Sequence, residues 1–95
     1  MDLEVGIAKV NNPPAALEAM LRGGGLAALA SSPGCRSAKV MPGVEQPDRL
    51  LFLVEWDSVE AHAAAKSSES FQKFVKIMSP YFAGEGSMQH FRAGE

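Results

Sequence analysis

Two histidines are the side chains in this 95-residue sequence best suited to carry a proton near neutral pH. His62 follows the apolar segment that ends at Trp56, and helical spacing puts it one turn after Val59. Because Val59 is expected to face the core, His62 can point toward a pocket. The alternative is a partly buried histidine that is hydrogen-bonded to the backbone. We take His62 as a candidate general base.

His90 is the second candidate base. It lies within a short extended segment, where alternation puts it on the same face as Met88 and Arg92. Gln89 and Phe91 occupy the opposite face. The alternation leaves open which of these two faces meets the helices.

A set of mostly aromatic side chains could line a pocket next to the histidines. Trp56 can stack on an aromatic ligand, and the Tyr81 hydroxyl can hydrogen-bond one. For both residues, simple packing is the alternative role. The candidate substrate-binding residues are Trp56, Phe71, Phe74, Tyr81, Phe52 and Met88.

Several other kinds of site are not expected. One cysteine, Cys35, and two histidines without ligand-type spacing do not make a metal site. The run Gly23-Gly24-Gly25 lacks the Lys-Ser/Thr pair of a phosphate-binding loop, and no Gly-x-Ser-x-Gly motif is present. We therefore expect no metal.

Net charge and hydropathy limit the classes of partner that the protein is expected to bind. The net charge is −2 and the basic residues are scattered, which argues against nucleic-acid binding. No apolar run approaches the ~18 residues of a membrane span. A lone cysteine cannot form an internal disulfide. These features favour a cytoplasmic protein that binds neither nucleic acid nor membrane.

Hydrophobic periodicity and turn residues predict the elements. Asn12 and Pro13 should start the first helix, which the three glycines should divide into two short helices. The alternative role of the glycines is to let backbone or a ligand approach closely. Asp57 is expected to cap the next helix with Glu60 as capping-box partner. The expected strands are 3–10, 35–41, 49–56 and 87–92; the expected helices are 13–30, 57–66 and 67–78.

Two patterns within these elements indicate how they pack. Ser67 and Ser68 can cap the last helix, whose apolar stripe is Phe71, Phe74, Val75 and Met78. Residues 50–54 are apolar without alternation, as in a strand that is buried on both faces.

The element order predicts an α+β fold: one ferredoxin-like, two-layer domain over residues 1–95, with helices on one face of an antiparallel sheet. Such a sheet has a second face that helices do not cover. A second copy of the chain would cover it, so a homodimer is expected.

Three segments resemble the antibiotic biosynthesis monooxygenase (ABM) domain family. Residues 53–62 are similar to that family's strand-to-helix turn, residues 67–74 to its Phe-bearing helix, and residues 88–91 to its last strand. The resemblance implies a dimeric α/β barrel with a ligand pocket between sheet and helices in each subunit. Members include cofactor-free oxygenases of aromatic polyketides, haem-degrading enzymes, polyketide cyclases and proteins with no established reaction. Resemblance to the oxygenases implies that this chain needs no cofactor.

Departures from two branches of the family narrow the expected activity. The haem-degrading branch has a Trp where Ala65 stands and a His where Val75 stands, so haem degradation is not expected. The plant-type cyclase branch has a Tyr at Ala65 and histidines at Phe71 and Leu50. A cyclase built on this chain would need other residues.

Three functions remain as hypotheses. The first is a cofactor-free monooxygenase of secondary metabolism that oxidises an aromatic, polyketide-type substrate, with His62 or His90 as base. The second is a polyketide cyclase or isomerase that uses the same base. The third is a non-catalytic, dimeric binding or stress-response module.

Overall fold

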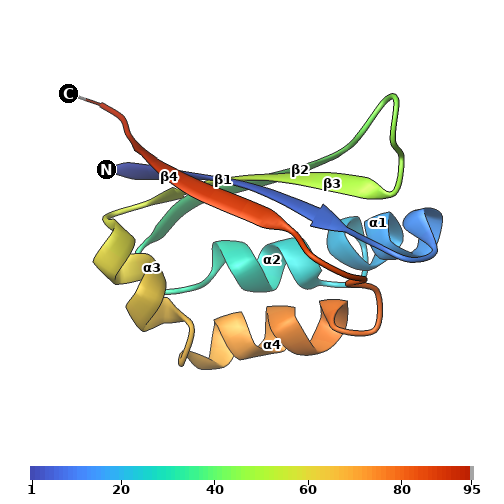
Figure 1. Ribbon diagram of the computed structural model, residues 1–95. Coiled ribbons are helices and arrows are strands. Elements are labelled where there is room, and N and C mark those ends of the chain that lie inside the picture. The colour runs from blue at the N-terminus through green and yellow to red at the C-terminus, as the bar shows by residue number, and fades with distance from the viewer. Residues whose placement is uncertain (95) are drawn as a thin grey trace.

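The computed structural model describes residues 1–94, which form a four-stranded antiparallel sheet with helices on one face (Figure 1). The strands lie in the order β2-β3-β1-β4. They are β1 (Asp2–Lys9), β2 (Cys35–Pro42), β3 (Arg49–Trp56) and β4 (Ser87–Arg92). The helices are α1 (Pro13–Leu21), α2 (Gly25–Ala30), α3 (Val59–Ala65) and α4 (Glu69–Met78). This is the expected α+β, ferredoxin-like fold.

β3 shows that the two faces of the sheet differ. Phe52 and Trp56 are buried under the helices, together with the other even-numbered residues of the strand. Leu51 and Leu53 point to the opposite face and are only half-buried, because no element of the described chain covers it. The apolar run is therefore buried on one face within a single chain.

The glycine run divides the first helical segment in two, as predicted. Gly24 has a φ of 93°, a left-handed conformation that favours glycine. A Cβ at Gly23 would lie 2.8 Å from the carbonyl oxygen of Ala19. The chain turns between α1 and α2 at residues where a side chain would be strained or would clash.

Asn12 precedes α1 as expected but does not cap it. Its φ of 46° is left-handed, and its side chain makes no capping hydrogen bond. The proline at the start of the helix has no N–H to satisfy, so less capping is needed there.

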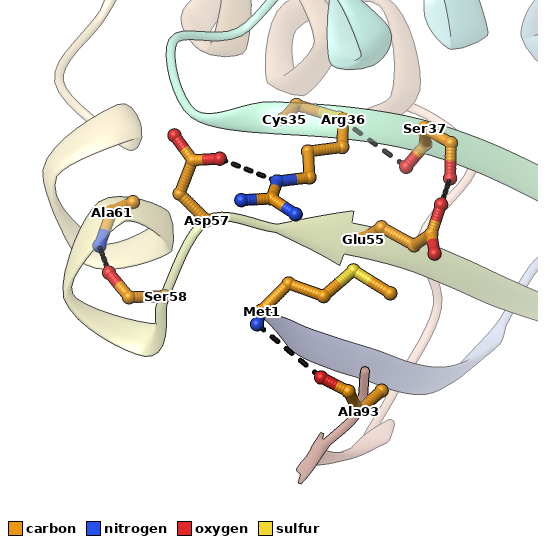
Figure 2. A network of polar contacts seen from close by, with 9 residues as sticks. All are labelled: Met1, Cys35, Arg36, Ser37, Glu55, Asp57, Ser58, Ala61 and Ala93. Carbon is orange, nitrogen blue, oxygen red and sulfur yellow. Dashed lines mark hydrogen bonds and ion pairs between the residues drawn. The ribbon is translucent and has the colours of Figure 1, made fainter. Parts of the chain in front are cut away.

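The predicted start of α3 was wrong by one residue. Ser58, not Asp57, is the cap: its Oγ accepts a hydrogen bond from the backbone nitrogen of Ala61 at 3.0 Å. Asp57 instead accepts a hydrogen bond from Nε of Arg36 at 2.7 Å (Figure 2). The competing ion pair turns the aspartate toward β2, and the neighbouring serine then caps the helix.

Other polar contacts in Figure 2 tie the strand ends together near this turn. Ser37 on β2 donates to Glu55 on β3, and the nitrogen of Met1 donates to the carbonyl of Ala93. The second contact joins the residues that flank β1 and β4. These bonds hold the end of the sheet from which α3 departs.

α4 has the predicted cap but a narrower buried face than predicted. Ser68 accepts a hydrogen bond from the backbone nitrogen of Phe71, and Phe74 and Met78 are buried. Val75 is 37% exposed, so its place in the buried stripe was wrong. α4 packs mainly on α2 rather than on the sheet (Figure 1), which leaves the Val75 side of the helix at the surface.

Candidate functional site

A cavity of about 300 Å³ lies between the sheet and the helices. It is lined by side chains from both sheet and helices and by the segment after α4. Most of the lining is apolar, and two ionisable groups stand in it. The main apolar residues are Leu29, Phe52, Phe71, Phe74, Phe82 and Met88; the ionisable ones are Glu4 and His62.

β1 leaves room for the cavity because its helix-facing residues include Gly6 and Ala8. A Cβ at Gly6 would lie 3.2 Å from Oε2 of Glu4 and 3.7 Å from Cβ of Phe52. Gly6 therefore forms an open part of the cavity wall, which any larger side chain would begin to fill.

The aromatic wall is fixed by edge-to-face packing. The ring centroids of Phe71 and Phe74 are 5.5 Å apart, and those of Phe52 and Phe74 are 6.1 Å apart. Phe82, from the segment after α4, packs on both Phe52 and Phe74 at 6.3 Å. Contacts of this kind hold the rings in preferred relative orientations.

Four side chains from four elements meet at the polar end of the cavity, and we call them the acid–base cluster: Glu4 (β1), Trp56 (β3), His62 (α3) and His90 (β4). His62 is 4% exposed and stacks on Trp56, with ring centroids 4.5 Å apart and planes 10° apart. Its Nδ1 lies 2.8 Å from Nε2 of His90. Its Nε2 lies 3.5 Å from Oε1 of Glu4. That same oxygen accepts a hydrogen bond from Trp56 Nε1 at 2.9 Å.

Burial controls the charges in this cluster. Burial, together with the smaller effects of the nearby His90 and Lys66, lowers the pKa of His62 to about 4. Burial also raises the pKa of Glu4, against the opposing effects of the Trp56 hydrogen bond, His90 and Lys66. His62 is therefore neutral near pH 7, where one ring nitrogen donates and the other accepts.

The structure brings both predicted histidines together. β4 presents His90 and Met88 toward the helices, which answers the question that the alternation left open. The argument that led to His62 was partly wrong, since Val59 is 40% exposed. α3 rests its His62 and Ala65 side on the rest of the molecule instead.

The aromatic candidates divide into three groups by position. Phe52, Phe71 and Phe74 line the cavity together with Met88. Trp56 is fully buried behind His62 and supports the cluster instead of lining the cavity. Tyr81 lies apart from the cavity, in a shallow groove beside α1 and Ile77 of α4.

Glu4 is the cluster residue that sequence reasoning missed. Alternation in β1 suggests that its apolar residues, Leu3, Val5 and Ile7, face the core. The side of β1 that faces the helices is instead the one that carries Glu4. The sequence held one relevant signal. A buried Trp56 needs an acceptor for its indole N–H, and Glu4 is a carboxylate on a neighbouring strand.

Residues 1–94 contain no group of three or more His, Cys, Asp or Glu side chains that could hold a metal ion. Within the same residues, no helix is long and apolar enough to cross a membrane.

Comparison with known proteins places this chain in a family. The family model described as antibiotic biosynthesis monooxygenase, ABM, matches residues 15–77, which is more than half of the chain. No curated protein matches significantly.

Solved structures match over nearly the whole chain at low sequence identity. A Bordetella bronchiseptica protein that carries the same family name superposes with a TM-score of 0.82 and 22% identity, covering 99% of this chain and 97% of its own. A Caulobacter crescentus protein of that name gives 0.76 and 24%, covering 99% and 90%. SnoaB, a cofactor-independent oxygenase from Streptomyces nogalater, gives 0.76 and 16%, covering 99% and 93%. At these identities the structures show a shared fold, and the family model establishes that the chain belongs to the antibiotic biosynthesis monooxygenase family.

Proposed function

We propose that this protein is a cofactor-independent monooxygenase that oxidises a small aromatic, polyketide-type compound in secondary metabolism. One observation carries the proposal: an aromatic-walled cavity ends in a buried, neutral histidine beside a carboxyl group. Such a cavity can hold a fused-ring phenol, and the cluster can accept its proton.

The size and lining of the cavity support an aromatic ligand. Its volume of about 300 Å³ is at the lower end for small-molecule sites, which suits a compact molecule of a few fused rings. Phe52, Phe71 and Phe74 offer ring edges and faces for stacking. The rest of the lining has few polar groups, so the polar end of the cavity should set the orientation of the ligand.

The proposed reaction draws its electrons from the substrate. Proton loss from an anthrone gives an electron-rich anion, which transfers one electron to dioxygen. The two radicals then combine to a peroxide anion, which takes back the proton and becomes a hydroperoxide. Loss of water leaves a quinone, so one oxygen atom enters the product and the other leaves as water. The chain's own part is to take up the proton and to hold the anion where water is scarce, which strengthens electrostatic contacts.

The same proton-transfer cluster favours a second candidate, a polyketide cyclase or isomerase. Removal of a proton next to a carbonyl gives a carbanion that can close a ring or shift a double bond without dioxygen. The cluster would serve either reaction, and only the need for oxygen separates them. A binding or stress-response module without catalysis is the third outcome.

We also propose that the chain works as a homodimer, with the uncovered sheet faces packed together. That face carries apolar side chains from all four strands, of which several are exposed or half-buried in one chain. They are Leu3, Val5, Ile7, Met41, Leu51, Leu53 and Phe91. Apolar patches of this kind on a small protein mark association sites.

Oxygen uptake by purified protein with a panel of hydroxylated anthrones tests the proposed function. No metal, flavin or nicotinamide is added, and products are followed by mass under isotopically labelled dioxygen. Uptake with one labelled atom in the product supports the monooxygenase. A cyclised or dehydrated product without uptake supports the cyclase. No turnover of any panel member counts against both enzymes and favours the binding module.

A further inference from the structure

Both ring nitrogens of His62 already face partners within the protein. Nδ1 is 2.8 Å from Nε2 of His90, and Nε2 is 3.5 Å from Oε1 of Glu4. The ring lies flat on Trp56, which fixes its plane. His62 therefore borders the cavity without a nitrogen free to exchange a proton with a ligand.

His90 is no better placed to meet a ligand. Its Nε2 is directed at His62, and the residue does not line the cavity. The two histidines that residue chemistry singles out are thus engaged with each other.

Glu4 is the ionisable group of the acid–base cluster with an oxygen, Oε2, that no residue of the described chain engages. Its Oε1 accepts the Trp56 N–H and faces His62. Its Oε2 lies over Gly6, where an added Cβ would come within 3.2 Å of it, and Gly6 lines the cavity. Oε2 accepts no hydrogen bond from any residue of the described chain.

We propose that Glu4, through Oε2, is the catalytic residue that exchanges a proton with the ligand, and that His62 and His90 are positioning residues behind it. The assignment deepens the proposed function and rests on it for the reaction, but binding tests it separately. His90 Nε2–H can donate to His62 Nδ1, and His62 Nε2–H then faces Oε1. This arrangement leaves Oε2 directed into the cavity.

The surroundings of Glu4 suit a base. Burial raises the pKa of its carboxyl, which makes the carboxylate a stronger proton acceptor. The ionisable groups around it are the imidazoles of His62 and His90, the Lys66 ammonium and the Cys35 thiol. Of these, His62 stays neutral down to about pH 4, so above that pH the acid-side loss of affinity for a neutral phenol should follow the Glu4 carboxyl and not His62.

The test is calorimetric titration with naphthol, a phenol without other ionisable groups, across a series of pH values. Wild-type affinity should fall about tenfold as the Glu4 carboxylate is protonated, because a charge-assisted hydrogen bond is lost. Glu4→Gln keeps an acceptor for Trp56 and should bind about tenfold more weakly near pH 7, with no dependence on pH. Glu60→Gln, the same change on the exposed side of α3, should bind like wild type.

Further variants keep the inference falsifiable if Glu4→Gln does not fold. Glu4→Asp withdraws the carboxyl by one methylene, and should bind about tenfold more weakly while still losing affinity in acid. His62→Gln should also retain the acid-side loss. Wild-type affinity and pH dependence in Glu4→Gln would overturn the assignment. So would loss of the pH dependence only in His62→Gln, or no naphthol binding by wild type.

Oxygen uptake then separates this inference from the proposed function. If Glu4 controls naphthol binding but no anthrone is oxidised, the assignment of Glu4 stands and the oxygenase fails. If Glu4→Gln oxidises anthrones at the wild-type rate, the oxygenase stands and Glu4 is not its base. Under both proposals together, Glu4→Gln should lower kcat by about a hundredfold or more.

Discussion

His62 is a buried imidazole that the fold keeps neutral. It is stacked on Trp56 and hydrogen-bonded to His90, so a proton added to its ring would be poorly solvated. The cost of that charge lowers its pKa to about 4. The arrangement that holds the cluster together therefore also makes the protein sensitive to acid.

Stability should fall between about pH 6.5 and pH 4 because of His62. In that range the unfolded chain binds a proton that the folded chain does not, so folding becomes less favourable as the pH falls. The loss should be at most roughly 3.5 kcal/mol, at about 1.4 kcal/mol per pKa unit. Urea unfolding across this range should show a shallower acid loss in His62→Phe than in wild type.

Glu4 acts in the opposite sense and supplies the control. Its raised pKa means that the folded chain binds the extra proton, so its contribution is lost as the pH rises above the ordinary value of 4.5. Glu4→Gln removes that contribution and should make the acid-side loss from His62 steeper. Equal pH profiles in wild type and His62→Phe would contradict the argument.

Gly6 should control how large a ligand the cavity can hold. Gly6→Val would extend a side chain between Glu4 Oε2 and Phe52, so naphthol affinity should fall at least about tenfold. The fold should survive, because valine suits a strand. Calorimetry and thermal unfolding check both points, with Ala63→Val on the exposed side of α3 as control. Unchanged affinity in Gly6→Val would mean that the ligand binds elsewhere.

Residue chemistry alone identified His62 and His90, since few side chains in this sequence can move a proton near neutrality. It did not identify Glu4. In the sequence, a carboxylate that alternates with apolar strand residues is expected to face solvent. In the folded protein the helices cover the face of β1 that carries Glu4. Tyr81 shows the opposite failure: its chemistry suited a pocket, but the chain carries it to another side of the molecule.

At the scale of elements, α3 holds His62 against the sheet, and two local features fix its place. Ser58 caps its first turn. Gly34, with a φ of 82°, lets the start of β2 approach the helix so closely that a Cβ would lie 2.9 Å from Cβ of Ala61. A short helix without such contacts would be marginal in water.

Ser58→Ala should cost about 1 kcal/mol of unfolding free energy, as expected for loss of an N-cap. Because α3 positions His62, naphthol affinity should also fall several-fold. Ser31 is an exposed serine at the end of α2, and its hydroxyl donates a hydrogen bond to the carbonyl oxygen of Ala27. Ser31→Ala should leave naphthol affinity unchanged. Urea unfolding and calorimetry report the two effects. Loss of stability in Ser58→Ala without loss of affinity would show that the cap does not position the cluster.

The strands and the division between α1 and α2 followed from the sequence, because periodicity and glycine runs are strong local signals. The start of α3 did not. Asp57 and Ser58 are both good caps, and the choice depends on Arg36, which is distant in sequence but adjacent in the sheet. Val75 was misplaced for a similar reason, since the stripe does not reveal that α4 packs on α2.

At the scale of the molecule, the bare sheet face should make the protein a dimer. Leu53→Lys puts a charge in the middle of that face, on an inner strand of the sheet. Sedimentation at micromolar concentration should give a dimer for wild type and a monomer for Leu53→Lys, because burying an unpaired charge is costly. Lys73→Glu, on the exposed side of α4, is the control. A monomeric wild type would contradict the proposed dimer.

β1 lies between β3 and β4, so the first and last strands of the chain are neighbours, and Glu4 is paired in register with His90. Figure 1 shows the start of β1 and the end of β4 at the same end of the sheet. Trp56 follows Glu4 by 52 residues, and His90 follows His62 by 28. During synthesis, β1 and the four described helices therefore emerge from the ribosome before β4. Until β4 pairs with β1, Met88 and Ser87 are missing from the cavity wall and His62 lacks its hydrogen-bond partner, so the cavity and the acid–base cluster are completed only when β4 joins the sheet.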